Sequence, residues 1–102
     1  MGIVYGDEKN FKKLIGDKKV LIDFYAEWCG PCKMLGPVLE EVSKEMKESI
    51  IVKVDIDKNM DLAKQYGIMS VPTMLIFKKG EEVGRHTGYM DKDRLIDWLN
   101  DN

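Results

Sequence analysis

Apolar and polar positions along the first two thirds of the chain predict strands and helices in alternation. Residues 20–25 form a nearly unbroken apolar run between charged residues, which is typical of a strand buried on both faces of a sheet. Residues 31–47 place their apolar side chains three or four positions apart, which predicts an amphipathic helix. A β-branched run over 50–54 predicts a second strand, and residues 60–66 predict a short helix that Asn59 can cap.

The last third of the chain predicts two strands in direct succession. Residues 73–77 and 82–87 are the predicted strands, and the few residues between them suit an antiparallel hairpin. Residues 92–100 predict a closing helix that Asp91 caps, with an apolar stripe that includes Trp98 and faces the core.

At the N-terminal end, residues 3–5 predict a short strand, and Asp7 is predicted to cap a helix that ends at Ile15. No linker, repeat or low-complexity segment interrupts the pattern. The sequence therefore predicts an α/β protein in which residues 1–102 form a single domain.

The composition narrows the classes of function. The chain carries 16 Lys and Arg against 18 Asp and Glu, a formal net charge of −2, so no basic surface for a nucleic acid is expected. The first residues lack the basic and apolar regions of a secretion signal, and no apolar run is long enough to span a bilayer. We therefore expect a cytoplasmic protein that binds neither nucleic acid nor membrane.

Cys29 and Cys32 are the only cysteines in the chain. A secreted domain held by disulfides needs several pairs and a structural zinc site needs four ligands, so the chain fits neither class. The single histidine, His86, falls on a predicted edge strand and is interpreted as a solvated surface residue without function. No metal and no bound cofactor are expected.

The cysteine pair lies between the end of a predicted central strand and the start of a predicted helix. A helix N-terminus carries partial positive charge and free N–H groups, and both stabilise a thiolate. A lowered pKa of Cys29 raises the fraction of thiolate that attacks a disulfide at neutral pH. Cys32, in the first helical turn, is within reach of Cys29 for a disulfide. Cys29 is therefore predicted to be the more exposed and more acidic thiol.

Two segments carry a resemblance to a known family. Residues 24–33, with the sequence Phe-Tyr-Ala-Glu-Trp-Cys-Gly-Pro-Cys-Lys, and the later Val71-Pro72-Thr73 closely resemble the thioredoxin family. The order of the predicted elements matches that family across essentially the whole chain. The resemblance implies the thioredoxin fold, a central mixed β-sheet flanked by helices on both faces. It also implies a protein-disulfide reductase in which Cys29 attacks a disulfide and Cys32 resolves the mixed disulfide.

Asp23 is a carboxylate inside the apolar run of residues 20–25, where an unpaired charge is costly to bury. In the thioredoxin family the corresponding aspartate helps to move the proton of the second cysteine, so the resemblance implies this role for Asp23. Burial predicts a raised pKa for its carboxyl group. Lys53 matches the lysine that the family places near this aspartate, although a solvated strand end is nearly as simple an interpretation of Lys53.

The resemblance further implies a surface for client proteins around the cysteines. Pro72 matches the family's cis-proline, which exposes the Val71 backbone for pairing with an extended substrate segment. A trans proline that opens a strand is the alternative from the residues alone. Trp28, Gly88 and Met69 are expected to complete an apolar rim, and the alternative for each is packing in the core.

The leading hypothesis is an electron carrier that acts as a monomer. Its substrates are disulfide-containing client proteins, and the resemblance implies a thioredoxin reductase, linked to NADPH or ferredoxin, that recharges it. Gly30 and Pro31 are expected to belong to the same client-binding surface, and their turn restricts the conformation of the two cysteines. A proline there accompanies reducing behaviour in this family, which disfavours an oxidase or isomerase. A second alternative is a non-catalytic partner module whose cysteines are dispensable.

Overall fold

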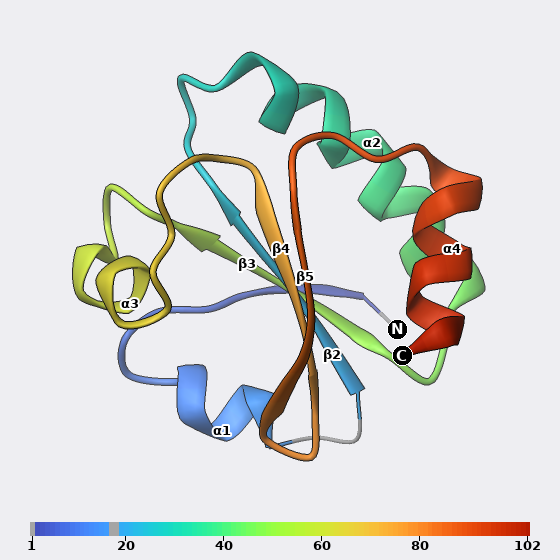
Figure 1. Cartoon of the computed structure of the whole chain (residues 1–102), viewed down its shortest axis with the longest axis horizontal. Helices are drawn as coiled ribbons and strands as arrows, with labels where there is room; N and C mark the ends of the chain where they lie inside the picture. The colour runs from blue at the N-terminus through green and yellow to red at the C-terminus, as the bar shows by residue number, and fades with distance from the viewer. Residues whose placement is uncertain (1, 17–18) are drawn as a thin grey trace.

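Five strands pair into one sheet in the order β1-β3-β2-β4-β5 in the computed structural model, which describes residues 2–16 and 19–102 (Figure 1). β1, β3 and β2 are parallel, whereas β4 is antiparallel to both β2 and β5. This confirms the predicted mixed sheet. The elements in chain order are β1 (Ile3–Tyr5), α1 (Phe11–Ile15), β2 (Lys19–Tyr25), α2 (Gly30–Glu45), β3 (Ile50–Asp55), α3 (Met60–Gln65), β4 (Thr73–Lys78), β5 (Glu81–Thr87) and α4 (Lys92–Asp101).

β2 is the central strand, as its apolar run predicts. It lies between β3 and β4, and Val20, Leu21, Ile22 and Phe24 are fully buried. Because successive side chains of a strand point to opposite faces, burial of both even and odd positions requires cover on both faces of the sheet.

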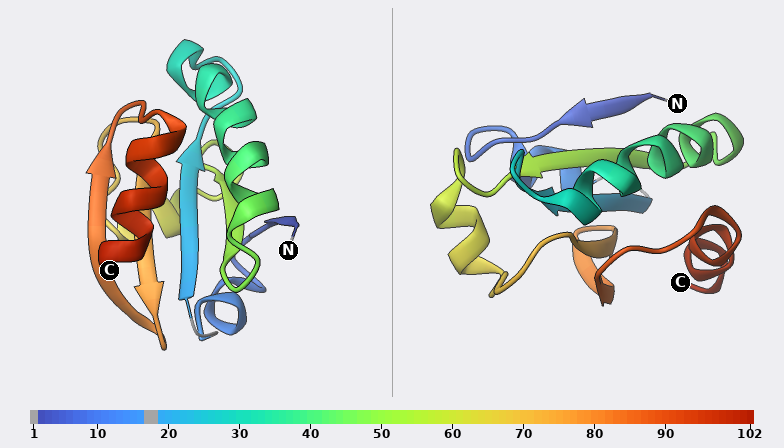
Figure 2. Two further views of the ribbon diagram at one scale, coloured as in Figure 1. Left: turned by 90° about the vertical axis from the view of Figure 1, so that its right-hand side faces the viewer. Right: turned by 90° about the horizontal axis from the view of Figure 1, so that it is seen from above.

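Helices supply that cover in two layers (Figure 2). Phe11 of α1 and Leu62 of α3 pack with the even-numbered side chains of β2 in one cluster. Leu35 of α2 and Leu95 of α4 pack with Leu21 in the cluster on the other face. Asp23 and Tyr25 share the odd-numbered face with Leu21, so both point toward the layer that contains α2.

The predicted hairpin between β4 and β5 is confirmed. Lys78 pairs with Glu81, which leaves a two-residue connection. Lys79 and Gly80 have φ values of 53° and 86°. Positive φ at both positions is what a type I′ turn requires, and this turn matches the twist of the two strands.

The predicted cap of α4 is confirmed, whereas the predicted cap of α1 is wrong. The Asp91 side chain accepts a hydrogen bond from the Arg94 N–H at 2.9 Å. Asp7 accepts hydrogen bonds from the N–H groups of Lys9 and Asn10, so it closes the turn before α1. The helix itself starts three residues later than a cap at Asp7 requires.

Asn59 stands immediately before α3 but does not cap it through its side chain. Its Nδ2 group donates to the Asp55 carbonyl oxygen at 3.1 Å, and its Oδ1 atom accepts from the Glu8 N–H at 3.2 Å. The Glu8 carboxylate accepts from the Asp61 N–H at 3.1 Å, in the first turn of α3. Glu8, which lies before α1, therefore accepts a hydrogen bond from the first turn of α3, whereas the side chain of Asn59 does not.

His86 and Trp98 both differ from their predicted environments, but in opposite directions. His86 was predicted to be solvated and Trp98 to be core, but both are half-buried. Their ring centroids lie 6.0 Å apart, between β5 and α4. The contact with the indole accounts for the partial burial of His86, and Trp98 packs at the margin of the core cluster below α4.

Gly6 lies where two segments approach too closely for a side chain. A Cβ atom at Gly6 would lie 2.6 Å from Cγ1 of Val52 and 3.3 Å from Cγ2 of Val54. Both valines are fully buried and stiff, so Gly6→Ala is expected to lower the free energy of unfolding by about 1–3 kcal/mol. Urea denaturation measures this loss. The control is Gly36→Ala in α2, which has open space for a methyl group and should gain about 0.5–1 kcal/mol. Equal effects of the two changes would contradict the close approach.

Candidate active site

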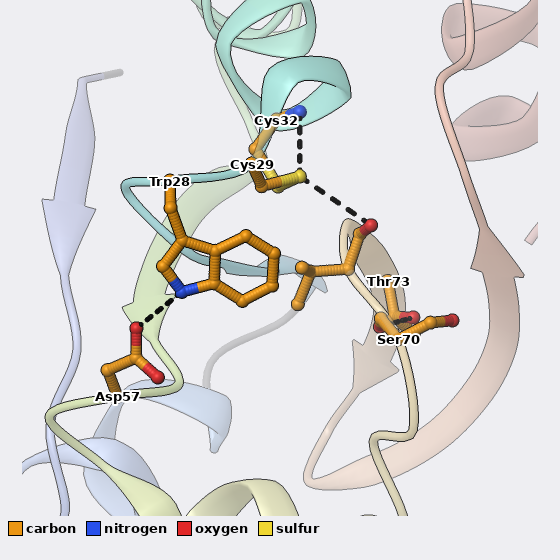
Figure 3. Close-up of a disulfide and its surroundings, with 7 residues drawn as sticks. Trp28, Cys29, Cys32, Asp57, Ser70 and Thr73 are labelled. Carbon is orange, nitrogen blue, oxygen red and sulfur yellow. Dashed lines mark hydrogen bonds between the residues drawn. A yellow bond between two sulfur atoms is a disulfide. The ribbon is translucent and has the colours of Figure 1, made fainter.

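The cysteine pair lies where β2 is followed by α2. Cys29 immediately precedes the helix, with an extended backbone at φ −89° and ψ 116°, and Pro31 lies in the first turn. Cys29 and Cys32 form a disulfide, with their Cα atoms 5.2 Å apart (Figure 3). The pair therefore stands beyond the carboxyl end of the central strand, where α/β proteins gather functional groups.

The sulfur of Cys29 accepts a hydrogen bond from the first turn of α2. The Cys32 N–H donates to Cys29 Sγ at 3.2 Å. On its other side the same sulfur lies 3.6 Å from the Val71 carbonyl oxygen (Figure 3). The N–H donor and the positive end of the helix dipole both favour negative charge on Cys29 over neutral thiol.

The two cysteines are equally buried in this oxidised form, with exposed fractions of 4% for Cys29 and 5% for Cys32. The prediction that Cys29 is the more exposed of the two is therefore wrong for the disulfide state. Tyr25 at the end of β2 and Val71 before β4 pack against the cluster that the pair forms with Ala26, so residues outside α2 help to bury the disulfide. What distinguishes the two sulfurs here is the hydrogen bond to Cys29.

Trp28 is exposed next to the disulfide and is held in place by a carboxylate. Its indole N–H donates to Asp57 Oδ2 at 2.9 Å (Figure 3), and 68% of the residue is exposed. Asp57 was not among the predicted site residues. The available signal was its position two residues after β3, which ends at the same edge of the sheet as β2.

The segment before β4 contributes the other wall of the site. The peptide bond between Val71 and Pro72 is cis. The Thr73 hydroxyl donates to the Ser70 carbonyl oxygen at 2.7 Å (Figure 3), and the Gly88 N–H donates to the Pro72 carbonyl oxygen at 2.8 Å. These bonds attach the segment to itself and to the end of β5, and Val71 thereby faces Cys29.

The structure brings together most of the predicted surface residues around Cys29. Val71 contacts the cysteine directly, and Pro72 links Val71 to Gly88. Trp28 lies on the opposite side of the disulfide from the Ser70 and Thr73 pair (Figure 3). Gly30, Pro31 and Met69 are exposed as well, Met69 to 95%.

Asp23 lies beneath the site, with only 1% of the residue exposed. Within the part of the chain that the structure describes, neither carboxylate oxygen has a hydrogen-bond partner. Burial raises the pKa of Asp23 from 3.8 to about 7, and the positive charge of Lys53 partly opposes this rise. A carboxyl group with such a pKa exchanges its proton near neutral pH.

Lys53 is aligned with Asp23 across the parallel pair β2 and β3. It is half-buried, and its ammonium nitrogen lies 4.8 Å from the ring centroid of Tyr25. An open cleft of about 390 Å³ reaches from this contact to Cys32 of the disulfide. The cleft is lined by Tyr25, Ala26, Glu27, Cys32, Lys33, Gly36 and Lys53.

Residues 2–16 and 19–102 hold no group of three or more His, Cys, Asp or Glu side chains arranged for a metal ion. In the same residues, no helix has both the length and the apolar character needed to cross a membrane. A larger cleft of about 1030 Å³ lies at the opposite end of the sheet, near Lys19, Glu45 and Lys78. None of the predicted site residues lines it, so the chemistry belongs to the smaller cleft and the rim around Cys29.

Comparison with known proteins extends the similarity to the whole chain. The protein-family model Thioredoxin matches residues 2–101. A thioredoxin of Rickettsia felis is 47% identical over 96 residues, which cover 91% of each chain. A thioredoxin of Bacillus subtilis is 45% identical over 101 residues, covering 98% of this chain and 97% of the relative.

Solved structures agree with the sequence comparison. A mutant thioredoxin from Halobacterium salinarum NRC-1 has a TM-score of 0.92 to this chain at 37% identity. The similarity covers 98% of this chain and 89% of that one. Sequence and fold therefore match over nearly the full length, and the disulfide supplies the reactive group. This chain is a protein-disulfide oxidoreductase, and it belongs to the thioredoxin family.

Proposed function

We propose that the chain reduces disulfides of client proteins, with Cys29 as the attacking thiolate and Cys32 as the resolving thiol. The observation that carries the assignment is the hydrogen bond from the Cys32 N–H to Cys29 Sγ at the N-terminus of α2. This bond and the helix dipole stabilise negative charge on Cys29. Among the described residues no N–H group donates to the sulfur of Cys32.

The proposed cycle has two exchange steps. The Cys29 thiolate attacks one sulfur of the client disulfide, so a mixed disulfide forms and the other client sulfur leaves as a thiolate that takes up a proton. Cys32 then loses its proton and attacks Cys29 Sγ, which releases the second client sulfur. Two electrons have passed to the client, and the chain is left with the Cys29–Cys32 disulfide.

We assign the proton of Cys32 to Asp23 in the second step. Three features support this role: the carboxyl group is buried, its pKa is about 7, and both of its oxygens are free of protein hydrogen bonds among the described residues. Lys53 acts on Asp23 through its charge, because its positive charge opposes the rise in the pKa of the carboxyl group.

The client segment is proposed to bind across the rim in an extended conformation. The Val71 backbone, turned toward Cys29 by Pro72, offers peptide groups for pairing with such a segment. Trp28 offers a large exposed apolar face, and Gly88 leaves open space beside Pro72 because it has no side chain. Gly30 and Pro31 form the edge of the rim on the first turn of α2.

We further propose that residues 1–102 act as one monomeric domain in the cytoplasm. The oxidised form is recharged by a thioredoxin reductase that draws on NADPH or ferredoxin. Size-exclusion chromatography tests the monomer. Reduction of the Cys29–Cys32 disulfide by purified reductases of the two kinds tests the recharging partner.

Catalysed reduction of insulin disulfides by dithiothreitol tests the proposed function directly. The wild-type chain is expected to accelerate the reduction, because Cys29 cycles between dithiothreitol and insulin. A chain with both cysteines replaced by serine is the matched control and should give the uncatalysed rate. No acceleration by the wild-type chain would favour a non-catalytic partner module.

Pro31→His is expected to make the dithiol more oxidising by about tens of millivolts, a part of the spread of about 150 mV between reducing and oxidising members of this class. Pro31 restricts the first turn of α2, so histidine relaxes this restriction and its partial charge favours the Cys29 thiolate. The reduction potential, measured by equilibration with glutathione, checks this. An unchanged or more reducing potential would contradict the role assigned to Pro31.

A further inference from the structure

Lys53 has two neighbours that compete for its ammonium group. Asp23 and Tyr25 lie on the same face of β2, two residues apart, and Lys53 is aligned with Asp23 on β3. The ammonium nitrogen is 4.8 Å from the Tyr25 ring centroid, which is within the range of a cation–π contact. Within the part of the chain that the structure describes, Lys53 and Asp23 form neither an ion pair nor a hydrogen bond.

The choice of the aromatic ring over the carboxylate has a physical reason. Asp23 is 1% exposed, so an ammonium that moved into contact with it would lose its water. The cleft beside Tyr25 is open to solvent, and an ammonium over the ring keeps part of its hydration there. The cost of removing water from both charges opposes a buried ion pair between Lys53 and Asp23. Over the Tyr25 ring, the ammonium group finds a favourable contact without losing all of its water.

We propose that Tyr25 is a positioning residue that retains the Lys53 ammonium in the cleft beside Cys32 and so keeps it from pairing with Asp23. The inference rests on the proposed function of Asp23 as the proton acceptor of Cys32. Tyr25 also packs against the cysteine pair, but in this role its effect on Asp23 is exerted only through Lys53.

The consequence is electrostatic. Lys53 lowers the pKa of Asp23 even from its present position, and an opposite charge in direct contact would lower it further. The ring therefore keeps Asp23 able to accept a proton near neutral pH.

Other charged and titratable groups surround this contact and belong in the interpretation of any titration. Asp55 faces it from β3, Asp23 from β2, Glu27 from the loop after β2, and Tyr5 from β1. Cys32 and Lys33 of α2 line the same cleft. On β4 the residue aligned with Asp23 is Met74, which carries no charge.

The test follows the Asp23 carboxyl carbon by NMR across pH in the oxidised protein, where Cys29 and Cys32 do not titrate. Tyr25→Leu removes the ring and retains an apolar side chain, whereas Tyr25→Phe retains the ring and is the matched control. We expect Tyr25→Leu to lower the midpoint of Asp23 by about one pH unit, because Lys53 is released toward it. Tyr25→Phe should keep the wild-type midpoint.

The Lys53→Met background separates release of the ammonium from better hydration of Asp23. If the inference holds, Tyr25→Leu lowers the midpoint only when Lys53 is present. An equal downward shift in both backgrounds would assign the effect to hydration and overturn the proposal, and so would an unchanged or raised midpoint with Lys53 present.

A measurement on the unmutated protein keeps the proposal testable if a Tyr25 variant fails to fold. The ε-methylene protons of Lys53 should show an upfield ring-current shift, and shifts at random-coil values would overturn the inference. In Tyr25→Leu, a lowered Asp23 midpoint together with an unchanged pH profile of mixed-disulfide resolution would support the positioning by Tyr25. The same result would contradict Asp23 as the proton acceptor, so the two failures are distinguishable.

Discussion

Cys32→Ser is expected to accumulate a mixed disulfide with client proteins and to lose catalytic turnover. The variant keeps Cys29 at the N-terminus of α2, together with the backbone N–H that donates to its sulfur. Attack on a client disulfide therefore proceeds, but serine does not displace the client sulfur from Cys29. Non-reducing gel electrophoresis and mass spectrometry of the variant with a disulfide-containing protein should show a stable adduct through Cys29.

Cys29→Ser is the matched variant and is expected to form no such adduct. Cys32 remains in the first helical turn with 5% of the residue exposed in the oxidised form, and no equivalent N–H donor to its sulfur is found among the described residues. Both variants should lose insulin reduction completely, for different reasons. A stable adduct of Cys29→Ser, with none for Cys32→Ser, would reverse the assigned roles.

Asp23→Asn is expected to stabilise the fold above neutral pH by up to about 4 kcal/mol. The pKa of Asp23 is about 7 in the folded chain against an ordinary value of 3.8, and each unit corresponds to about 1.36 kcal/mol. Because the unfolded chain ionises Asp23 first, wild-type stability falls as pH rises from about 4 to about 7 and levels off above that range. The asparagine variant has no ionisation at this position and does not follow the fall.

Chemical denaturation of both proteins at several pH values measures this difference. The gap in the free energy of unfolding should be small below about pH 4, where the carboxyl group is neutral in both states. The gap should grow between about pH 4 and about pH 7 and stay constant at higher pH. A gap that does not depend on pH would show that Asp23 does not titrate with a raised pKa. The same variant should resolve mixed disulfides more slowly, which stopped-flow kinetics can follow.

The periodic segments were predictable because their burial is a local property of the pattern. The apolar run of residues 20–25 indicated a strand covered on both faces, and β2 is the central strand. Pro31 was predicted in the first helical turn and lies there. Asp91 was predicted to cap the last helix and does so. Each of these depends on residues within a few positions of one another.

The predictions that were wrong depend on contacts across the fold. Asp7 is an exception, because its carboxylate accepts from the nearby N–H groups of Lys9 and Asn10 and closes a local turn before α1. The side chain of Asn59 bonds to Asp55 and Glu8 and does not cap α3. A short polar side chain chooses between local and distant partners, and the local pattern does not contain the distant ones. His86 was assigned to solvent for the same reason, because its cover is supplied by a helix that begins several residues later.

The sequence by itself determined the reactive pair, its place between a strand and a helix, and the presence of a costly carboxylate at Asp23. Spacing and hydrophobic pattern are sufficient for these features, since they involve one turn of chain. Only the tertiary structure decided that Asp57 holds Trp28, that Val71 covers Cys29, and that Lys53 lies over Tyr25. These contacts join segments that are 28 to 42 residues apart, so strand register and loop packing create them and no local pattern encodes them.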